Sequence, residues 1–223
     1  MSLIVFDLDG TLIDSRLDLA ESTNEMLASY GATPLPVDRV AMMVGEGARV
    51  LVERALGAAG LDSAEPDALA RFRAIYDQRL LGHTRPYDGI PDLVQRLSVG
   101  HTLAVLTNKP DEPSRRLLDA FGLSRHFRCV IGGDGRHRRK PDPAGLQALM
   151  DEYDAEPSGT WLVGDSMIDV ETARRAGTRM CVVLYGFGQL RGELVLDGSE
   201  ATVREPREIA DVVSETNHEA VKP

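Results

Sequence analysis

The sequence contains few cysteines and no long hydrophobic run. Among its 223 residues only Cys129 and Cys181 are thiols, too few for a disulfide framework or a zinc site, so we expect two buried free cysteines. No stretch approaches the ~18–20 consecutive apolar residues of a membrane-spanning helix. Residues 1–7 also lack the basic and apolar segments of a signal peptide. These absences predict a cytoplasmic protein with no membrane partner.

Basic charge is also scarce. The chain has 25 lysines and arginines against 35 aspartates and glutamates, which gives a net charge of -10. Proteins that bind nucleic acid present a basic surface, so this balance argues against a nucleic-acid partner. The basic run at 136–140 is short and contains no aromatic residue that could stack on a base, which favours a solvated loop.

Short apolar runs recur along the chain, and most of them end in Gly, Asp, Thr or Asn. Because these runs are apolar at every position, they predict strands buried on both faces of a parallel sheet. Helical patterns lie between them, so the fold class is α/β with a Rossmann-like parallel-sheet core. The expected strands are 3–6, 102–106, 129–131, 161–163, 180–184 and 201–203, and the expected helices are 91–97, 114–120, 143–153, 170–176 and 209–213.

Residues 14–86 interrupt this alternation. They contain no convincing strand, and their patterns predict helices over 16–30, 48–59 and 67–80, with Ser15 available as an N-cap. We therefore expect an all-α cap domain at 14–86, inserted into a catalytic core formed by 1–13 and 87–223. The two connections, 12–15 and 85–89, are the expected hinges of a cap that closes over the core. The pattern leaves open whether the protein is a monomer or a homodimer.

Asp7 and Asp9 come directly after the first expected strand. In open α/β sheets ligands bind outside the carboxyl ends of the strands, so both carboxylates can point into one crevice. One carboxylate can attack phosphorus and form an aspartyl-phosphate. Its neighbour can give a proton to the leaving oxygen and later take one from water. Gly10 allows a tight backbone turn beside them.

Further polar residues follow the other expected strands. Thr107 and Asn108 offer a hydroxyl and a backbone amide to phosphoryl oxygens. Lys140 is one of three lysines among the 25 basic residues, and its compact ammonium suits a point contact to both Asp7 and phosphate. Asp165 adds a third carboxylate to the sheet edge, which makes a hard oxygen site suited to Mg²⁺. Asp169 could cap the following helix or orient a water on the metal.

These groups, in this order, resemble the sequence motifs of the haloacid dehalogenase superfamily. The resemblance covers essentially the whole chain. It implies a Rossmann-like core, an α-helical cap inserted after the first strand, Mg²⁺ and an aspartyl-phosphate intermediate. The matching segments are 7–12 for the first motif, 107–108 for the second, 140–141 for the third, and 164–166 with 169 for the fourth.

The resemblance also implies a role for each matching residue. Asp7 is then the nucleophile and a metal ligand, and Asp9 is the general acid/base and a metal ligand through its backbone carbonyl. The other implied roles are phosphate binding by Thr107, Asn108 and Lys140, metal binding by Asp165, and support of the metal by Asp169.

Within the superfamily the sequence is most similar to phosphoglycolate phosphatases. Gly45 and Gly47 precede an expected cap helix whose free N–H groups can hold an anion such as a substrate carboxylate. Arg49 could add a fork-shaped contact. Glu46 differs from the neutral polar residue frequent in relatives, so either Glu46 points away or the substrate differs. This similarity rests on residues 44–56, 85–89, 132–134 and 139–143.

Two classes of function stay open. The first is a Mg²⁺-dependent phosphomonoester hydrolase, with 2-phosphoglycolate as the expected small-molecule partner. The alternatives are hydrolysis of a sugar phosphate, a nucleotide or pyrophosphate, or a sugar phosphomutase reaction. The presence of Asp9 argues against a dehalogenase, which needs no proton donor at this position. A phosphonate hydrolase of this superfamily needs a lysine in the cap, and residues 14–86 contain none. The second class is a non-catalytic regulator or binding module, which the intact acidic residues disfavour.

Overall fold

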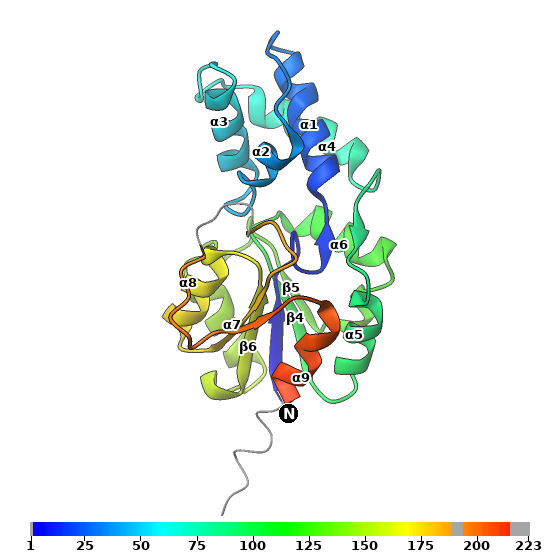
Figure 1. Cartoon of the computed structure of the whole chain (residues 1–223), viewed down its shortest axis with the longest axis vertical. Coiled ribbons are helices and arrows are strands. Elements are labelled where there is room, and N and C mark those ends of the chain that lie inside the picture. Colours follow the sequence, from blue (N-terminus) through cyan, green and yellow to red (C-terminus); the bar gives the residue numbers. More distant parts are fainter. Residues whose placement is uncertain (1, 189–193, 215–223) are drawn as a thin grey trace, which may run out of the picture.

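A parallel sheet forms the lower part of the molecule (Figure 1). The computed structural model describes residues 2–188 and 194–214, and its main sheet has the strand order β5-β4-β1-β6-β7-β8, with every neighbouring pair parallel. All six expected strands are confirmed, with shifts of one residue at two of them. The strands are β1 (Leu3–Phe6), β4 (Thr102–Leu106), β5 (Cys129–Ile131), β6 (Thr160–Gly164), β7 (Arg179–Val183) and β8 (Ala201–Val203).

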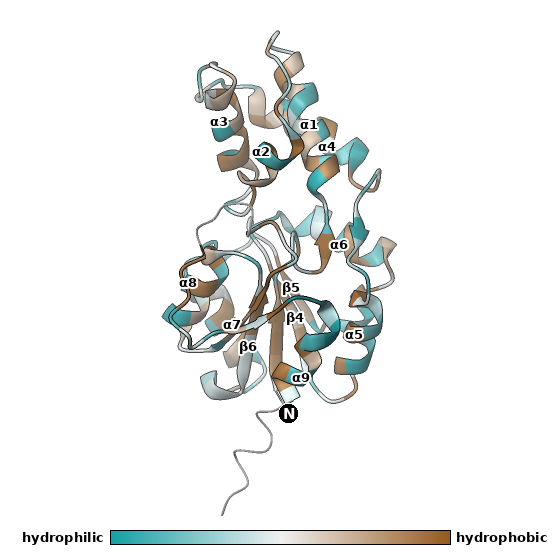
Figure 2. Cartoon of the chain, viewed as in Figure 1, coloured by the Kyte–Doolittle hydropathy of each residue, from teal (hydrophilic) through white to brown (hydrophobic). Residues whose placement is uncertain are grey.

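Both faces of the sheet are buried, as the apolar runs predict. In β1, Ile4 and Phe6 join the hydrophobic cluster on one face, while Leu3 and Val5 join the cluster on the other. Helices α5 (Ile90–Leu97), α6 (Asp111–Ala120) and α9 (Ile209–Ser214) pack on the first face, and α7 (Ala144–Glu152) and α8 (Met167–Ala176) pack on the second. Full burial of each large apolar side chain contributes about 1.5–3 kcal/mol, so this three-layer core fixes the sheet edge that carries the polar residues. Figure 2 shows the apolar strands between these helices.

Four helices form the expected cap above the sheet (Figure 1). One chain segment leads from the core into the cap, and a second leads back to the core. The segments pair as a two-stranded antiparallel ribbon of β2 (Ile13–Asp14) and β3 (Arg85–Pro86), so the expectation of no strand near 14–86 is wrong at its two edges. Two-residue strands carry no periodicity that a sequence pattern could reveal. The helices are α1 (Arg16–Ala28), α2 (Val37–Ala41), α3 (Ala48–Ala58) and α4 (Ala68–Arg79), of which α2 was not expected.

A buried carboxylate ties the far end of the cap to its beginning. Asp18 on α1 is fully buried and accepts hydrogen bonds from the backbone N–H groups of His83 and Thr84 and from the Thr84 hydroxyl. These contacts hold the returning chain beside the departing one, next to the segments expected to act as hinges. The division into a cap at 14–86 and a core at 1–13 and 87–223 stays a prediction, and 189–193 and 215–223 lie outside the described residues.

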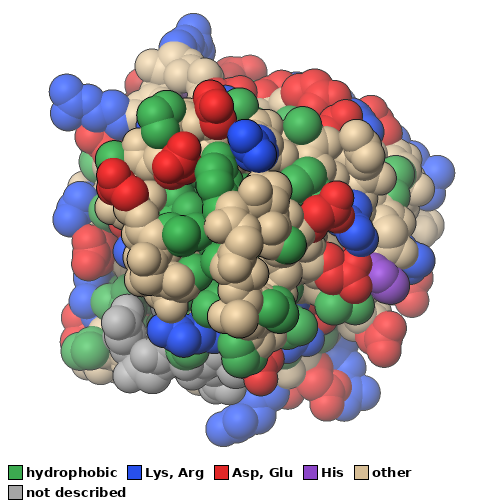
Figure 3. Space-filling view, turned by 90° about the horizontal axis from the view of Figure 1, so that it is seen from above, with side chains coloured by type: hydrophobic (Ala, Val, Ile, Leu, Met, Phe, Trp, Pro, Cys, Tyr) green, Lys and Arg blue, Asp and Glu red, His purple; other side chains and the backbone are tan. Residues whose placement is uncertain are grey.

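Charge is mixed on the cap end of the molecule. Figure 3 looks down on this end and shows acidic and basic side chains interspersed around its rim, with hydrophobic side chains nearer the middle. Among the described residues, no helix is long and apolar enough to cross a membrane. Both cysteines are free thiols, as expected, but only Cys181 is buried. The expectation of burial is wrong for Cys129, which lies on the edge strand β5 and is partly exposed.

Candidate active site

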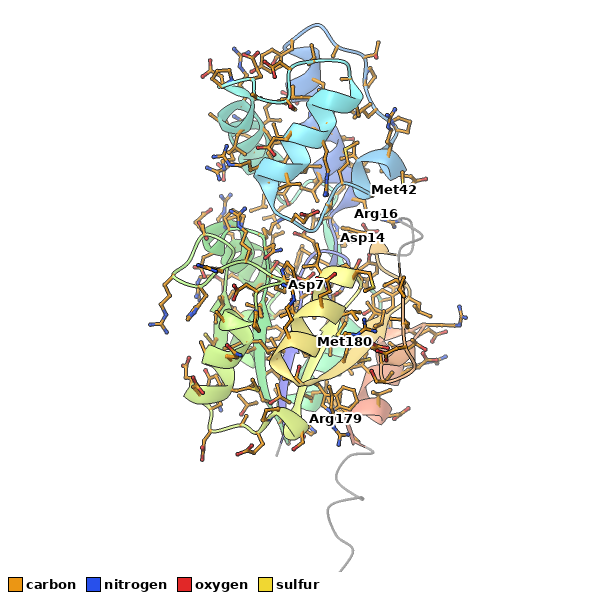
Figure 4. The ribbon with its side chains drawn as sticks, turned by 90° about the vertical axis from the view of Figure 1, so that its left-hand side faces the viewer. Asp7, Asp14, Arg16, Met42, Arg179 and Met180 are labelled. Atoms are coloured by element: carbon orange, nitrogen blue, oxygen red, sulfur yellow. The ribbon has the colours of Figure 1, made fainter. Side chains whose placement is uncertain are left out.

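Asp7 lies at the top of the core, where β1 ends below the cap (Figure 4). Its Oδ1 is 2.9 Å from Nζ of Lys140, and the same ammonium donates to Oδ1 of Asp169 at 2.5 Å. All three side chains are buried. Burial raises the pKa of Asp7 above its ordinary value, and Lys140 opposes only part of that shift. Burial lowers the pKa of Lys140, but Asp169 and Asp7 outweigh it, so its pKa is raised and the ammonium stays charged.

Asp165 lies beside Asp7 at the end of β6. Its Oδ2 accepts hydrogen bonds from the backbone N–H groups of Phe187 at 2.6 Å and Gly188 at 2.9 Å. Burial, together with the charges of Asp169 and Asp7, raises the pKa of Asp165 to about 8. The turn after β1 passes so close to Asp165 that a Cβ at Gly10 would lie 2.3 Å from Oδ2, and Gly10 has a φ of +89°. Only glycine fits that backbone position.

The carboxylates of Asp7, Asp165 and Asp169 form one buried group. Their oxygen atoms lie within 4.8 Å of one another, while Lys140 is the cation that pairs with Asp7 and Asp169. Three carboxylates against one ammonium leave an excess of negative charge in a low-dielectric environment, which is costly unless a cation compensates it. Oxygen donors of this kind match the preference of Mg²⁺. The residues present therefore fit a divalent cation at this site.

Asp169 is positioned more as a support than as an open ligand. Its Oδ1 accepts from Lys140, and its Oδ2 accepts from the backbone N–H and the hydroxyl of Ser166, which closes a capping box at the start of α8. The expectation that Asp169 caps the following helix is confirmed, and its second oxygen holds Lys140. Its role toward a metal stays a prediction.

Asp9 has a different set of partners, which tie it to the cap. Its Oδ1 accepts a hydrogen bond from the Ser15 hydroxyl at 2.6 Å, and Nζ of Lys109 lies 3.2 and 3.1 Å from its two oxygens. Ser15 occupies the N-cap position of α1 but makes no side-chain capping hydrogen bond, so the expectation that it caps this helix is wrong. Its hydroxyl is used by Asp9 instead.

Thr107 and Asn108 follow β4 at the same sheet edge, and both are buried. Thr107 Oγ1 accepts from the backbone N–H of Lys109 at 3.2 Å, which leaves the hydroxyl proton to donate toward the cavity. The side-chain amide of Asn108 donates to the carbonyl oxygens of Gly45 at 2.8 Å and Lys140 at 2.9 Å. Asn108 thus links the cap loop to the core, and phosphate binding would use its backbone amide.

The four candidate residues of the cap lie in the loop before α3 and in the first turn of α3, and they fall into two pairs. Gly45 and Gly47 line the cavity, and a Cβ at Gly47, where φ is +91°, would lie 3.2 Å from the carbonyl oxygen of Asn108. Glu46 pairs with Arg54 and does not line the cavity, so its carboxylate points away from the site. Arg49 is exposed and also lies outside the described residues that line the cavity. Its contact with substrate stays a prediction.

A cavity of about 450 Å³ lies between the core site and the cap helices. This volume is within the ~300–1,000 Å³ typical of small-molecule sites. The core contributes Asp7, Asp9, Thr107, Asn108 and Asp165 to its wall, so the structure brings these sequence-predicted residues together. Lys140 and Asp169 are not among the residues that line it; they lie behind Asp7. The predicted contact of Lys140 with phosphate stays a prediction.

Residues 4–183 match the family model of the haloacid dehalogenase-like hydrolases. The chain belongs to this family. Over 196 residues it is 42% identical to phosphoglycolate phosphatase 1 of Pseudomonas aeruginosa, covering 85% of this chain and 71% of that protein. It is 34% identical to N-acetylmuramic acid 6-phosphate phosphatase of the same organism, covering 96% of this chain and 95% of the relative.

The fold agrees with a solved member of the family. The crystal structure of a predicted phosphoglycolate phosphatase from Haemophilus somnus superposes with a TM-score of 0.88, at 29% identity and with 95% of this chain and 97% of that chain covered. The α/β fold class and the family resemblance seen in the motifs are thereby confirmed. The chain is a haloacid dehalogenase-like hydrolase of the phosphatase type.

Sequence reasoning missed three residues of this hydrolase site: Ser15, Lys109 and Tyr76. Ser15 and Lys109 contact Asp9, and the Tyr76 hydroxyl accepts a hydrogen bond from Lys109 at 2.6 Å. One signal was available for Lys109. It is one of three lysines in an arginine-rich chain, so the argument applied to Lys140 extends to it. Tyr76 had no such signal, since its spacing in α4 is that of an ordinary buried residue.

Proposed function

We propose that this protein is a Mg²⁺-dependent phosphomonoesterase that works through a phosphorylated Asp7, with 2-phosphoglycolate as its substrate. The observation that carries the proposal is the pairing of two differently held carboxylates at one cavity. Asp7 is buried against Lys140, while Asp9 is held by Ser15 and Lys109 two residues further on. Two carboxylates in different environments can take the different roles of nucleophile and proton carrier.

In the first step, Asp7 attacks the phosphorus atom of the ester. Lys140 fixes one carboxylate oxygen, Oδ1, which leaves Oδ2 to form the new oxygen–phosphorus bond. The bond from phosphorus to the leaving oxygen breaks, and Asp9 gives that oxygen its proton. The Thr107 hydroxyl and the Asn108 backbone amide hold the phosphoryl oxygens in place.

In the second step, water attacks the phosphorus of the aspartyl-phosphate and gives its proton to Asp9. Inorganic phosphate leaves, the Asp7 carboxylate is restored, and Asp9 is protonated for the next cycle. A bound Mg²⁺, held by Asp7, Asp165 and the backbone carbonyl of Asp9, would neutralise charge on the phosphoryl oxygens. Asp169 keeps Lys140 in line with Asp7 in both steps.

The substrate assignment rests on the relatives, and the size of the cavity keeps a larger ester as an alternative. The relative named phosphoglycolate phosphatase is 42% identical to this chain, which supports the same small substrate. The relative named for N-acetylmuramic acid 6-phosphate covers nearly the whole chain, so that ester is the second candidate. A cavity of about 450 Å³ leaves room for more than a two-carbon acid, which is why both belong in the test.

The test is kcat/KM for a panel of phosphomonoesters, measured with Mg²⁺ and with EDTA. The panel holds 2-phosphoglycolate, N-acetylmuramic acid 6-phosphate, a hexose phosphate, a nucleotide, pyrophosphate and p-nitrophenyl phosphate. We expect Mg²⁺-dependent hydrolysis with a preference of about tenfold or more for 2-phosphoglycolate, which equals about 1.4 kcal/mol of transition-state binding. A preference for another ester would make that ester the substrate in place of 2-phosphoglycolate. The absence of any Mg²⁺-dependent hydrolysis would overturn the proposed activity.

A further inference from the structure

Lys109 is a buried cation that holds Asp9 but has no contact with substrate in the proposed chemistry. Its side chain is 5% exposed, and it lines the cavity directly after the phosphate-binding pair Thr107 and Asn108. Besides its ion pair with Asp9, its Nζ donates to the hydroxyl of Tyr76 at 2.6 Å and lies 4.6 Å from the centre of that ring. Burying an ammonium group costs free energy unless an anion is paired with it. The ion pair with Asp9 balances the charge of Lys109 but does not explain why Lys109 lines the cavity.

The charges around the cavity give Lys109 a special position. Among the described residues that line it, the cationic side chains are Lys109 and Arg73, and Arg73 is exposed. Arg49, the cation expected from sequence to meet an anionic substrate, is not among the lining residues. An anionic group of a bound substrate, other than the phosphoryl group, therefore has one buried partner available.

The position of Lys109 also matches one part of the substrate. A general acid must come within ~2.6–3.2 Å of the oxygen it protonates, so the leaving oxygen sits beside the Asp9 carboxylate. Nζ of Lys109 is 3.1 and 3.2 Å from the two oxygens of that same carboxylate. The ammonium is thus within two hydrogen-bond lengths of the leaving oxygen. A carboxylate on the adjacent carbon atom has its oxygens about one hydrogen-bond length from the leaving oxygen, so it fits between that oxygen and Lys109.

We propose that Lys109, with the hydroxyl of Tyr76, recognises a carboxylate carried by the leaving group, one carbon from the oxygen that Asp9 protonates. The inference rests on the proposed phosphatase function and deepens it. It makes the substrate class a phosphorylated 2-hydroxy acid, and it assigns specificity to the segment after β4 and to α4 in place of Arg49.

Tyr76 brings the cap into this recognition. Its hydroxyl accepts the hydrogen bond from Lys109, which leaves its own proton free to donate to a carboxylate oxygen. The ring of Phe72, one turn earlier on α4, stacks on Tyr76 at a centroid distance of 5.7 Å and an interplanar angle of 7°, which fixes the direction of the hydroxyl. Lys109 belongs to the core and Tyr76 to the cap, and their hydrogen bond places both donors on the same side of the cavity.

The experiment compares two esters that differ in the carboxylate. We would measure kcat/KM for 2-phosphoglycolate and for 2-hydroxyethyl phosphate, in which a hydroxymethyl group replaces the carboxylate, on the wild type, Lys109→Met and Tyr76→Phe. A charge-assisted hydrogen bond is worth about 10-fold to 150-fold, so Lys109→Met should lower the ratio of the two kcat/KM values by about 10-fold or more. Tyr76→Phe should lower it by about threefold to tenfold. Glycolate inhibition should weaken in parallel, while inhibition by inorganic phosphate should not.

Arg71→Met is the matched control, because Arg71 lies on the same helix as Tyr76 but outside the residues that line the cavity. It should leave the ratio within about twofold of the wild type. The ratio cancels any loss that both esters share, such as a disturbed Asp9.

Each outcome separates the inference from the function on which it rests. If the wild type hydrolyses neither ester nor any member of the panel, the phosphatase proposal fails. If it hydrolyses both esters equally, or if Lys109→Met leaves their ratio unchanged, the phosphatase proposal stands and the role of Lys109 is overturned. Should Lys109→Met not fold, the ratio in Tyr76→Phe decides, and an unchanged ratio there overturns the inference.

Discussion

The core edge of the site and the cap loop differ in how their charged groups are held. At the core edge, Asp7, Lys140 and Asp169 are buried, and Lys140 forms an ion pair with each of the two carboxylates. In the cap loop, Glu46 pairs with Arg54 at the surface, where each side chain is 40% exposed. Interactions between buried charges are strong and geometrically strict, whereas exposed pairs contribute ~0–1 kcal/mol.

This difference separates chemistry from selectivity. The residues that would transfer the phosphoryl group come from one rigid sheet edge, and their placement depends on strands buried on both faces. The residues that meet the rest of the substrate come from both sides of the cavity and depend on how the cap sits. Substitutions of Asp7, Lys140 or Asp169 should therefore affect all substrates, and substitutions of residues that meet the rest of the substrate should affect them unequally.

The largest effect is expected for Asp7→Asn. The amide keeps the size of the side chain but removes the nucleophile, so kcat should fall by about 10⁴-fold or more for every ester. Circular dichroism and thermal unfolding should show an intact fold. Measurable turnover at even a tenth of the wild-type rate would mean that another group attacks phosphorus.

Asp9→Asn should have the second largest effect, about 10²-fold to 10⁴-fold on hydrolysis of alkyl esters. Asparagine can neither protonate the leaving oxygen nor accept a proton from water, so both steps slow. Stopped-flow and rapid-quench measurements separate the two rates. A loss confined to one step would show that a second group shares the proton transfers.

The buried carboxylates predict a linked dependence on pH and Mg²⁺. The pKa of Asp165 is about 8 in the folded chain against 3.8 for the ordinary group, so between these values the metal-free folded state holds a proton that the unfolded state has lost. Stability of the metal-free protein should therefore be highest at the acidic end of this window and fall as pH rises toward about 8.

Mg²⁺ needs the deprotonated carboxylate, so its stabilising effect should show the opposite trend. The rise in Tm on adding Mg²⁺ should be larger near pH 9 than near pH 5, by about 4 °C or more. Asp165→Asn should lose most of this difference. An equal rise in Tm at both ends of the range would contradict the assignment of Asp165 to the metal.

The smallest effects are expected at the exposed cap residues. Glu46→Gln breaks a surface pair with Arg54 and should change the free energy of unfolding by less than about 1 kcal/mol. Arg49→Met should change the ratio of 2-phosphoglycolate to 2-hydroxyethyl phosphate by less than about threefold, because Arg49 is exposed outside the cavity wall. A loss as large as that expected for Lys109→Met would restore Arg49 as the carboxylate contact.

The sequence predicted the sheet and its polar edge well, for a physical reason. A strand buried on both faces must be apolar throughout, and the polar residue that ends it is then conspicuous, as with Asp7 and Asp165. The ribbon of β2 and β3 is too short for any periodicity. The contacts of Lys109 link positions 33 and 100 residues apart: the one with Asp9 arises from the pairing of β1 with β4, and the one with Tyr76 from the seating of α4 against the core.

The most direct test of the central claim is to trap the phosphorylated Asp7. In Asp9→Asn, p-nitrophenyl phosphate can still phosphorylate the enzyme, because p-nitrophenolate leaves without a proton, while hydrolysis lacks its base. We predict a burst of p-nitrophenolate equal to the enzyme concentration, and a phosphorylated peptide that contains Asp7. Adding Asp7→Asn to this variant should abolish both signals. Steady release without a burst, and no phosphorylated peptide, would contradict nucleophilic attack by Asp7.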